Sequence, residues 1–367
     1  MKFSNRTIRV FAVVAGGAAL GACGGGANDA RTGGSANVFS ASPVAVTGSS
    51  AGLVVANVFD AINNAVVGSD LGAGVVTAAV IEGDRTGPGL FGIVRQQLAL
   101  ADRAARVLGS GGQLTGVQRE WNRTDFQSNG EPDPCPNTAN SRPDAIRLIW
   151  EDTDGDNRFS TGDALQMIFD GCRNDSIPIQ LDGAVAIDML TVNGDPGVTP
   201  PWDVAGRVSF SGFRASDAVT VLEIDGNLNY REDSSDGVNV SAHITGGTLK
   251  MTTTIGNSAN NQQMSGFEIR LATQNGNGSY ELTASGTVAT TGMGGSVDLS
   301  TLQTFTGTDF RSGAPDTGEM QINGANGSTL NVKAIGSGAV QMRPDADADG
   351  TPDSIIDTTW TDLNNLL

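Results

Sequence analysis

The sequence contains few basic residues. It has one histidine, and its 22 lysines and arginines are outnumbered by 40 aspartates and glutamates, which gives a formal net charge of -18. A single imidazole excludes a histidine-rich metal centre. The acidic balance excludes a nucleic-acid-binding protein, because such proteins need a basic surface to displace counterions from phosphates. A surface of this sign attracts divalent cations instead.

Aromatic residues are also scarce, at 5% of the 367 residues, whereas glycine occurs 50 times, about twice its ordinary share. The length is typical of about two domains. Hydrophobic residues make up 38% of the chain, which is enough to build a core, so the composition excludes a chain that is disordered throughout.

The N-terminal segment has the features of a secretory signal peptide. Lys2, Arg6 and Arg9 precede an apolar run from Val10 to Leu20. At about 1.5 Å per residue this run is too short to cross a ~30 Å hydrocarbon layer as a helix, so it indicates a signal h-region.

The residues that follow, Leu20-Gly21-Ala22-Cys23, resemble the lipobox of bacterial lipoproteins. The resemblance implies that residues 1–22 are removed and that Cys23 becomes a lipidated N-terminus. Gly24, in place of an aspartate, implies an outer-membrane location by the sorting rule of enterobacterial lipoproteins, with the protein facing the periplasm or the cell surface. The alternative is an ordinary secretory signal whose cleavage site happens to precede Cys23.

With Cys23 lipidated, two cysteines remain, Cys135 and Cys172. An even number in an exported protein favours a disulfide. Two unpaired buried thiols are the alternative.

The mature chain divides into three parts by composition. Residues 23–48 are rich in Gly, Ser, Ala and Asn and predict a flexible tether. Residues 49–112 predict a helical segment, and residues 113–367 predict an antiparallel β domain.

Two helices are expected in the helical segment. The first covers residues 50–67, with Val55, Val58, Ile62 and Val66 at helical spacing. The second covers residues 89–108, after Pro88 and before Gly109. Its apolar stripe consists of Leu90, Val94, Leu98, Ala101, Ala105 and Leu108.

From about residue 115 the apolar residues alternate with a period of two, as in Phe267, Ile269 and Leu271. No βαβ rhythm is present. We therefore predict a mainly β fold: a long curved antiparallel sheet, a meander that is open or partly closed, with the two N-terminal helices packed on it. Turns are predicted at Asn193-Gly194, Asp225-Gly226, Asp236-Gly237, Gly246-Gly247 and Asn323-Gly324.

Two glycine-containing segments allow either a hairpin turn or a bulge within a bent strand. They are Leu181-Asp182-Gly183-Ala184 and Ile224-Asp225-Gly226-Asn227. A bulge is favoured for the first, because the apolar alternation resumes immediately after it.

The section 135–192 resembles uncharacterised exported bacterial lipoproteins that have an Asp-rich loop, a Gly-Asp pair and a cysteine after the next strand. These features correspond here to Asp152–Asp156, Gly162-Asp163 and Cys172. The resemblance implies a β-rich fold and no known activity.

The Asp-rich loop also resembles the calcium loops of EF-hand and dockerin proteins over twelve residues. Positions 1, 3, 5, 7, 9 and 12 are Asp152, Asp154, Asp156, Arg158 (through its carbonyl), Ser160 and Asp163. Asn157 stands where glycine is usual, and the flanking segments have strand character. The segment therefore predicts a calcium-binding β-hairpin loop. A solvated acidic turn is the alternative.

A second candidate lies near the C-terminus, where Asp345, Asp347, Asp349 and Asp353 resemble one unit of the calcium-binding thrombospondin type 3 repeats. The alternative is an exposed acidic hairpin, because single repeats bind poorly without neighbours.

One catalytic pattern is present. Gly48-Ser49-Ser50-Ala51-Gly52 matches the G-x-S-x-G motif of serine hydrolases, and His243 is the only histidine that could act as base. Almost no folded chain precedes the motif, however, and Ser49 or Ser50 suits the N-cap of the following helix. The acidic residues also offer many carboxylate pairs of the glycosidase kind, but the aromatic residues are too scattered to form a sugar platform.

The sequence thus predicts a non-catalytic, membrane-anchored lipoprotein that serves as a calcium-stabilised β scaffold or binding surface in the cell envelope. Calcium and the lipid on Cys23 are the expected bound groups. The membrane is an expected partner, together with an envelope protein, a glycan or an apolar ligand. One alternative is a carrier that holds an apolar ligand between the helices and the curved sheet, and another is a serine hydrolase acting through Ser50.

Overall fold

The computed structural model divides the chain into two units, Met1–Val38 and Phe39–Leu367. The structure describes residues 41–66, 117–122, 135, 145–156, 160–174, 179–195, 199–216, 220–256, 258–274, 279–308 and 314–367, all of them in the second unit. The predicted signal peptide, the lipidation site Cys23, the predicted helix over 89–108 and Arg158 lie outside the described residues.

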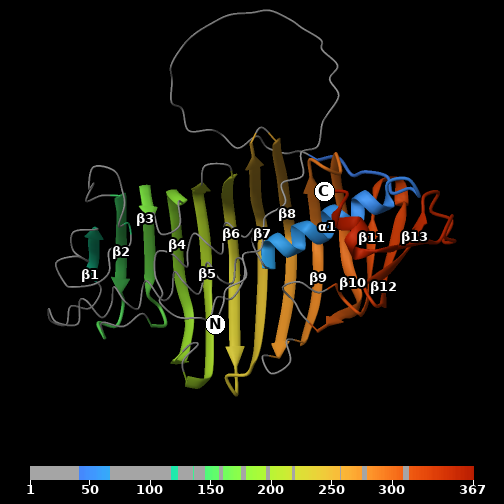
Figure 1. Ribbon diagram of the computed structural model, residues 1–367. Helices are drawn as coiled ribbons and strands as arrows, with labels where there is room; N and C mark the ends of the chain where they lie inside the picture. Colours follow the sequence, from blue (N-terminus) through green and yellow to red (C-terminus); the bar gives the residue numbers. More distant parts are fainter. Residues whose placement is uncertain are drawn as a thin grey trace, which may run out of the picture. The chain divides into compact units, whose positions relative to one another are not determined.

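The described strands form one antiparallel sheet of 14 strands in which each strand pairs with the next one along the chain (Figure 1). β1 and β14 are its two edges, so the described sheet is open, and the predicted meander is confirmed. The strands are β1 (Val117–Asn122), β2 (Ile146–Asp152), β3 (Ala164–Asn174), β4 (Ile179–Asp195), β5 (Thr199–Ser216), β6 (Thr220–Ser234), β7 (Asn239–Ile255), β8 (Ser258–Gln274), β9 (Ser279–Thr290), β10 (Gly295–Gly307), β11 (Thr317–Asn323), β12 (Thr329–Gly336), β13 (Ala339–Asp345) and β14 (Ile356–Thr359).

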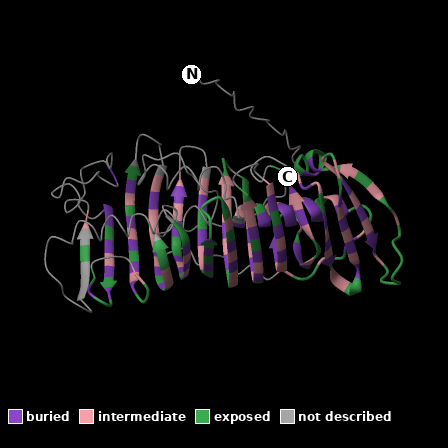
Figure 2. Ribbon diagram, turned by 90° about the horizontal axis from the view of Figure 1, so that it is seen from below, coloured by how far each residue is buried: buried purple, intermediate pink, exposed green. Residues whose placement is uncertain are grey.

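Burial alternates along these strands, as the banding in Figure 2 shows. In β8, Phe267, Ile269 and Leu271 are buried, as their spacing predicts. Alternation follows from the pleat, which points successive side chains to opposite faces. One face of the sheet therefore carries the core, and the opposite face, which includes less buried side chains such as Glu268 and Arg270, is called the polar face.

A row of glycines crosses the middle of the sheet, and the strand ladders shift register along it. Gly171 in β3, Gly212 in β5 and Gly266 in β8 lie at such shifts and have positive φ. An extra residue in one strand of a pair exchanges the faces of the residues beyond it. In β5, for example, Phe210 is buried before the bulge and Phe213 after it.

Aspartates support this row from neighbouring strands. The bulged N–H of Gly171 donates to Asp182 Oδ1 of β4 (2.8 Å), and that of Gly212 donates to Asp225 Oδ1 of β6 (2.7 Å). A bulge leaves a backbone N–H without its partner in the ladder, and here each carboxylate takes the place of the missing backbone acceptor. The Asp-Gly pairs in β4 and β6 thus belong to the bulges of the sheet.

The turn predictions had mixed outcomes. Asp236-Gly237 and Asn323-Gly324 lie at turns between consecutive strands, as predicted. Asn193-Gly194 lies at the end of β4, where the ladder shifts register. The predictions at Asp225-Gly226 and Gly246-Gly247 were wrong, because both pairs lie inside strands. Leu181–Ala184 lies inside β4 and is not a turn, as favoured, but the extra residues of the register shifts beside it belong to the neighbouring strands β3 and β5.

The first predicted helix is present as α1 (Ala51–Val66). Its Val55, Val58 and Ile62 side chains are fully buried. The helix contacts β8, β9 and β13, and strands β9 to β13 curve around it (Figure 1).

A short C-terminal helix, α5 (Trp360–Asn364), packs on α1. The ring of Phe59 in α1 lies 4.6 Å from that of Trp360 and 5.4 Å from that of Phe305 in β10, measured between centroids. Aromatic pairs at these distances add to the free energy gained by burial. The Phe59 side chain therefore connects α1 to both α5 and the sheet.

Polar side chains of α1 also contact the sheet. Thr290 of β9 donates to Asn57 Oδ1 (2.7 Å), and Gln262 of β8 donates to Asp60 and accepts from Asn64 (3.0 Å). Burial raises the pKa of the Asp60 carboxyl above its usual value, and hydrogen bonding from the Gln262 and Asn64 side chains opposes this shift. Polar contacts of fixed geometry set the rotation of a helix more specifically than apolar contacts do.

The segment before α1 lies along the end of the sheet. Pro43 forms a parallel bridge with Ser296 of β10, the N–H of Val44 donates to the Ser296 carbonyl (3.0 Å), and that of Val46 donates to Ser328 Oγ (2.9 Å). The last residues of the predicted tether, from Ala41 onward, therefore belong to the folded part.

A disulfide joins Cys135 to Cys172 of β3, with the two Cα atoms 5.2 Å apart. Both residues are buried in the core. The predicted pairing is therefore present in the structure.

Candidate metal sites in two aspartate loops

The first aspartate loop connects β2 to β3. Asp152 is the last residue of β2 and is fully buried, whereas Asp154 and Asp156 are exposed. One carboxylate oxygen from each of the three lies within 4.8 Å of the other two. These residues could hold a metal ion.

Hydrogen bonds shape this loop around its carboxylates. Asp152 Oδ1 accepts from the N–H of Gly155 (2.7 Å). The two oxygens of Asp163 accept from the N–H groups of Thr153 and Ser160, both at 2.8 Å. The Asp163 carboxylate thus closes the loop by holding its two ends.

The residues predicted as calcium ligands in the first loop therefore have two different roles. Asp152, Asp154 and Asp156 lie together, and the Ser160 hydroxyl donates to Asp154 Oδ2 (3.1 Å) beside them. Asp163 is bound to backbone amides. Burial raises the pKa of the Asp163 carboxyl, the two amides oppose that shift, and the charges of Asp152 and Asp154 add to it.

The second aspartate loop connects β13 to β14. Asp345 is the last residue of β13 and is 6% exposed. Asp345, Asp347 and Asp353 each place a carboxylate oxygen within 4.8 Å of the other two. Asp349, the fourth predicted residue, lies outside this triad and accepts the N–H of Thr351 (2.7 Å).

The carboxylate of Asp345 is only half satisfied. Its Oδ2 accepts the N–H of Gly350 (2.9 Å), but its Oδ1 is buried and has no hydrogen-bond partner among the described residues. An orphaned buried carboxylate oxygen is costly. Sequence reasoning missed this feature, because the burial of the strand end depends on the packing around it.

The two loops share one hydrogen-bond plan. In each loop a buried aspartate is the last residue of a strand. The N–H of the residue after this buried aspartate donates to a second aspartate further along the chain. Asp163 accepts from Thr153 in the first loop, and Asp353 accepts from Ala346 (2.7 Å) in the second. Because like charges so close together repel, each triad favours a cation among its oxygens.

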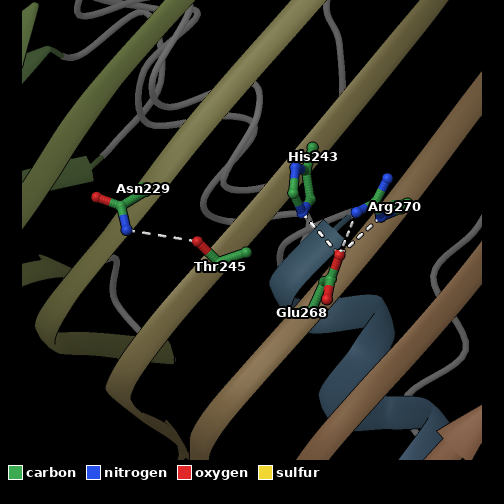
Figure 3. Close-up of polar contacts among 5 residues, drawn as sticks. All are labelled: Asn229, His243, Thr245, Glu268 and Arg270. Carbon is green, nitrogen blue, oxygen red and sulfur yellow. Dashed lines mark hydrogen bonds and ion pairs between the residues drawn. The ribbon is translucent and has the colours of Figure 1, made fainter. Parts of the chain in front are cut away.

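The polar face of the sheet carries a separate charged cluster on β7 and β8 (Figure 3). His243 Nε2 lies 3.0 Å from Glu268 Oε1, and Arg270 Nε donates to the same oxygen (2.7 Å). These contacts, with Arg270 the larger cause, lower the pKa of the Glu268 carboxyl. Glu268 and Arg270 are two residues apart in β8, and Arg270 pairs with His243 of β7. Spacing of two charged residues within a strand is the signal by which the sequence could have revealed this cluster.

An open hollow of about 400 Å³ lies beside this cluster, and its lining includes Arg231, Asp233, His243, Arg270 and Glu281. Arg231 is paired with Asp203 through two hydrogen bonds, of 3.1 and 3.0 Å. The hollow thus has mixed charge, with its Arg231 and Arg270 side chains already held by carboxylates.

The two residues of the hydrolase hypothesis have other contacts. The Ser50 hydroxyl lies 2.9 Å from the Thr47 N–H and 3.1 Å from Thr47 Oγ1, at the start of α1. His243 contacts Glu268 on the polar face. The contacts of these two described residues do not bring them together.

Comparison of the chain with protein-family models, with curated proteins and with solved structures finds no match. In the described part of the chain, no helix has the length and apolar character that spanning a membrane requires.

Proposed function

We propose that this protein is a non-catalytic lipoprotein of the bacterial cell envelope, anchored in the outer membrane by a lipid on Cys23. Its curved sheet serves as a scaffold or binding surface. Calcium bound at the β2–β3 loop stabilises it. The partner is an envelope protein, a glycan or an apolar ligand.

The observation that carries the calcium assignment is the convergence of Asp152, Asp154 and Asp156 at the end of β2. Calcium prefers six to eight oxygen ligands, and carboxylates are its usual charged ligands. The buried position of Asp152 places a negative charge where water cannot screen it. A cation bound beside this carboxylate would offset the free-energy cost of burying the charge. An affinity on the order of 0.1 to 1 mM is typical of extracellular calcium modules.

Replacing Asp154 and Asp156 with asparagine is expected to reduce the stabilisation that calcium provides. At a calcium concentration about ten times the dissociation constant, one site contributes about 1.4 kcal/mol, or about 2 to 4 °C in melting temperature. Thermal unfolding with and without calcium measures this difference.

The matched control is Asp188→Asn, which removes an exposed carboxylate from β4, outside both loops. It should keep the full calcium-dependent gain. An unchanged gain in the double variant would exclude the β2–β3 loop as a calcium site.

Replacing Cys23 with serine is expected to release the protein from membranes, because serine has no thiol to accept the lipid. Fractionation of cells expressing each form measures the effect, with Asn28→Ser in the predicted tether as control. Membrane association that persists in the Cys23 variant would refute lipid anchoring at this residue.

A further inference from the structure

The β13–β14 loop presents an unpartnered buried carboxylate oxygen next to two further carboxylates. Asp345 Oδ1 has no hydrogen-bond partner among the described residues, although Asp345 is only 6% exposed. A folded chain can offset the cost of burying a charge by pairing it or by coordinating a metal. In this loop the nearby carboxylates are negative, so they increase the need for a cation.

We infer that Asp345, Asp347 and Asp353 form a second divalent-cation site, of the calcium class, which holds the C-terminal segment on the sheet and on α1. The site is separate from the β2–β3 loop, and neither requires the other. Its chemistry is that of a hard cation bound by oxygen ligands.

The geometry of the triad suits such an ion. Calcium–oxygen distances are about 2.3 to 2.6 Å, so ligands on opposite sides of one ion lie about 4.6 to 5.2 Å apart. The three carboxylate oxygens lie within 4.8 Å of one another, so a single ion can contact all three. Exposure of Asp347 and Asp353 leaves room for water to complete the coordination shell.

Backbone hydrogen bonds hold the loop in its conformation, and they do not use Asp345 Oδ1. The Ala346 N–H donates to Asp353 Oδ2 (2.7 Å), the Gly350 N–H donates to Asp345 Oδ2 (2.9 Å), and the Asp353 N–H donates to the Pro344 carbonyl (2.8 Å). These bonds bring the two ends of the loop together and leave Asp345 Oδ1 for a ligand.

The position of the loop determines which part of the chain a bound cation would stabilise. Its far end continues into β14, which pairs with β13, and then into α5. The N–H of Trp360 in α5 donates to the Gly338 carbonyl (3.0 Å), and its ring packs on Phe59 of α1. A cation that joins Asp345 to Asp353 therefore fixes the start of β14, and with it the docking of α5.

The first test compares Asp347→Asn with Asp349→Asn in the full chain. Each removes one negative charge from the same exposed loop and retains an oxygen for its backbone hydrogen bond, but only Asp347 belongs to the triad. Calorimetric titration with calcium chloride should show binding weakened at least about tenfold by Asp347→Asn, and little changed by Asp349→Asn.

Hydrogen exchange of residues 356–364 is measured on the same proteins. Calcium should slow exchange there in the wild type and in Asp349→Asn, but not in Asp347→Asn. All measurements are repeated with Asp154→Asn and Asp156→Asn present, so that binding at the first loop and at the second are separated. No calcium-dependent protection of these residues, or equal loss in both variants, would overturn the inference.

A second variant, Asp345→Asn, tests the sign of the effect. In the presence of a chelator it should melt at a higher temperature than the wild type, because it removes an uncompensated buried charge. With calcium the order should reverse, because only the wild type gains a bound ion. A lower melting temperature in both conditions would mean that Asp345 is purely structural and would contradict the site.

Discussion

Replacing Gly183 with alanine is expected to destabilise the protein by about 3 to 5 kcal/mol. Gly183 has a φ of +88°, and a Cβ atom placed there would lie 2.0 Å from the carbonyl oxygen of Gly212 on β5. The obstacle is backbone in the interior of a sheet, so the two strands would have to separate. Urea unfolding followed by tryptophan fluorescence measures the loss.

The neighbouring glycine provides a matched control. Gly212 lies in the same bulge with a φ of +53°, but a Cβ atom added to it meets no atom within 4 Å. Gly212→Ala should therefore cost only the backbone penalty, about 1 to 2 kcal/mol. Equal losses for the two variants would show that the close approach of β4 and β5 does not limit stability.

Replacing both Cys135 and Cys172 with alanine is expected to lower the free energy of unfolding by roughly 3 to 4 kcal/mol. The disulfide spans 37 residues, and a cross-link of that length removes about this much conformational freedom from the unfolded chain. The cross-linked segment includes β2 and the first aspartate loop. Loss of the disulfide is therefore expected to destabilise the proposed calcium site as well.

A reductant supplies the control for this prediction. It should lower the urea midpoint of the wild type and leave that of the double variant unchanged. Mass spectrometry without reduction should find the two cysteines joined in one peptide pair. A wild type that contains free thiols at both positions, or that is insensitive to reductant, would contradict the role of the disulfide.

Much of the architecture could be predicted because it is encoded locally. The alternation of Phe267, Ile269 and Leu271 is visible within five residues, and it placed them correctly on the buried face. The helix over Ala51–Val66 was predicted to within one residue at each end from its apolar spacing. The pairing of Cys135 with Cys172 followed from the two cysteines that remain if Cys23 is the predicted lipidation site.

Other features depend on neighbouring strands and were not visible in the sequence. Asp225-Gly226 has the composition of a hairpin turn, but in the structure Gly226 continues β6, and Asp225 serves the bulge of β5. Register is set by the partner strand, so a local pattern cannot specify it alone.

The candidate sites show the same division. The sequence by itself determined that aspartates alternate in two loops, because residue type and spacing are properties of the chain. Only the tertiary structure decided that Asp163 closes its loop, that Asp349 lies outside the triad, and that Asp345 Oδ1 is buried without a partner among the described residues. Burial and hydrogen bonding depend on atoms from distant parts of the sequence, which only the folded chain brings together.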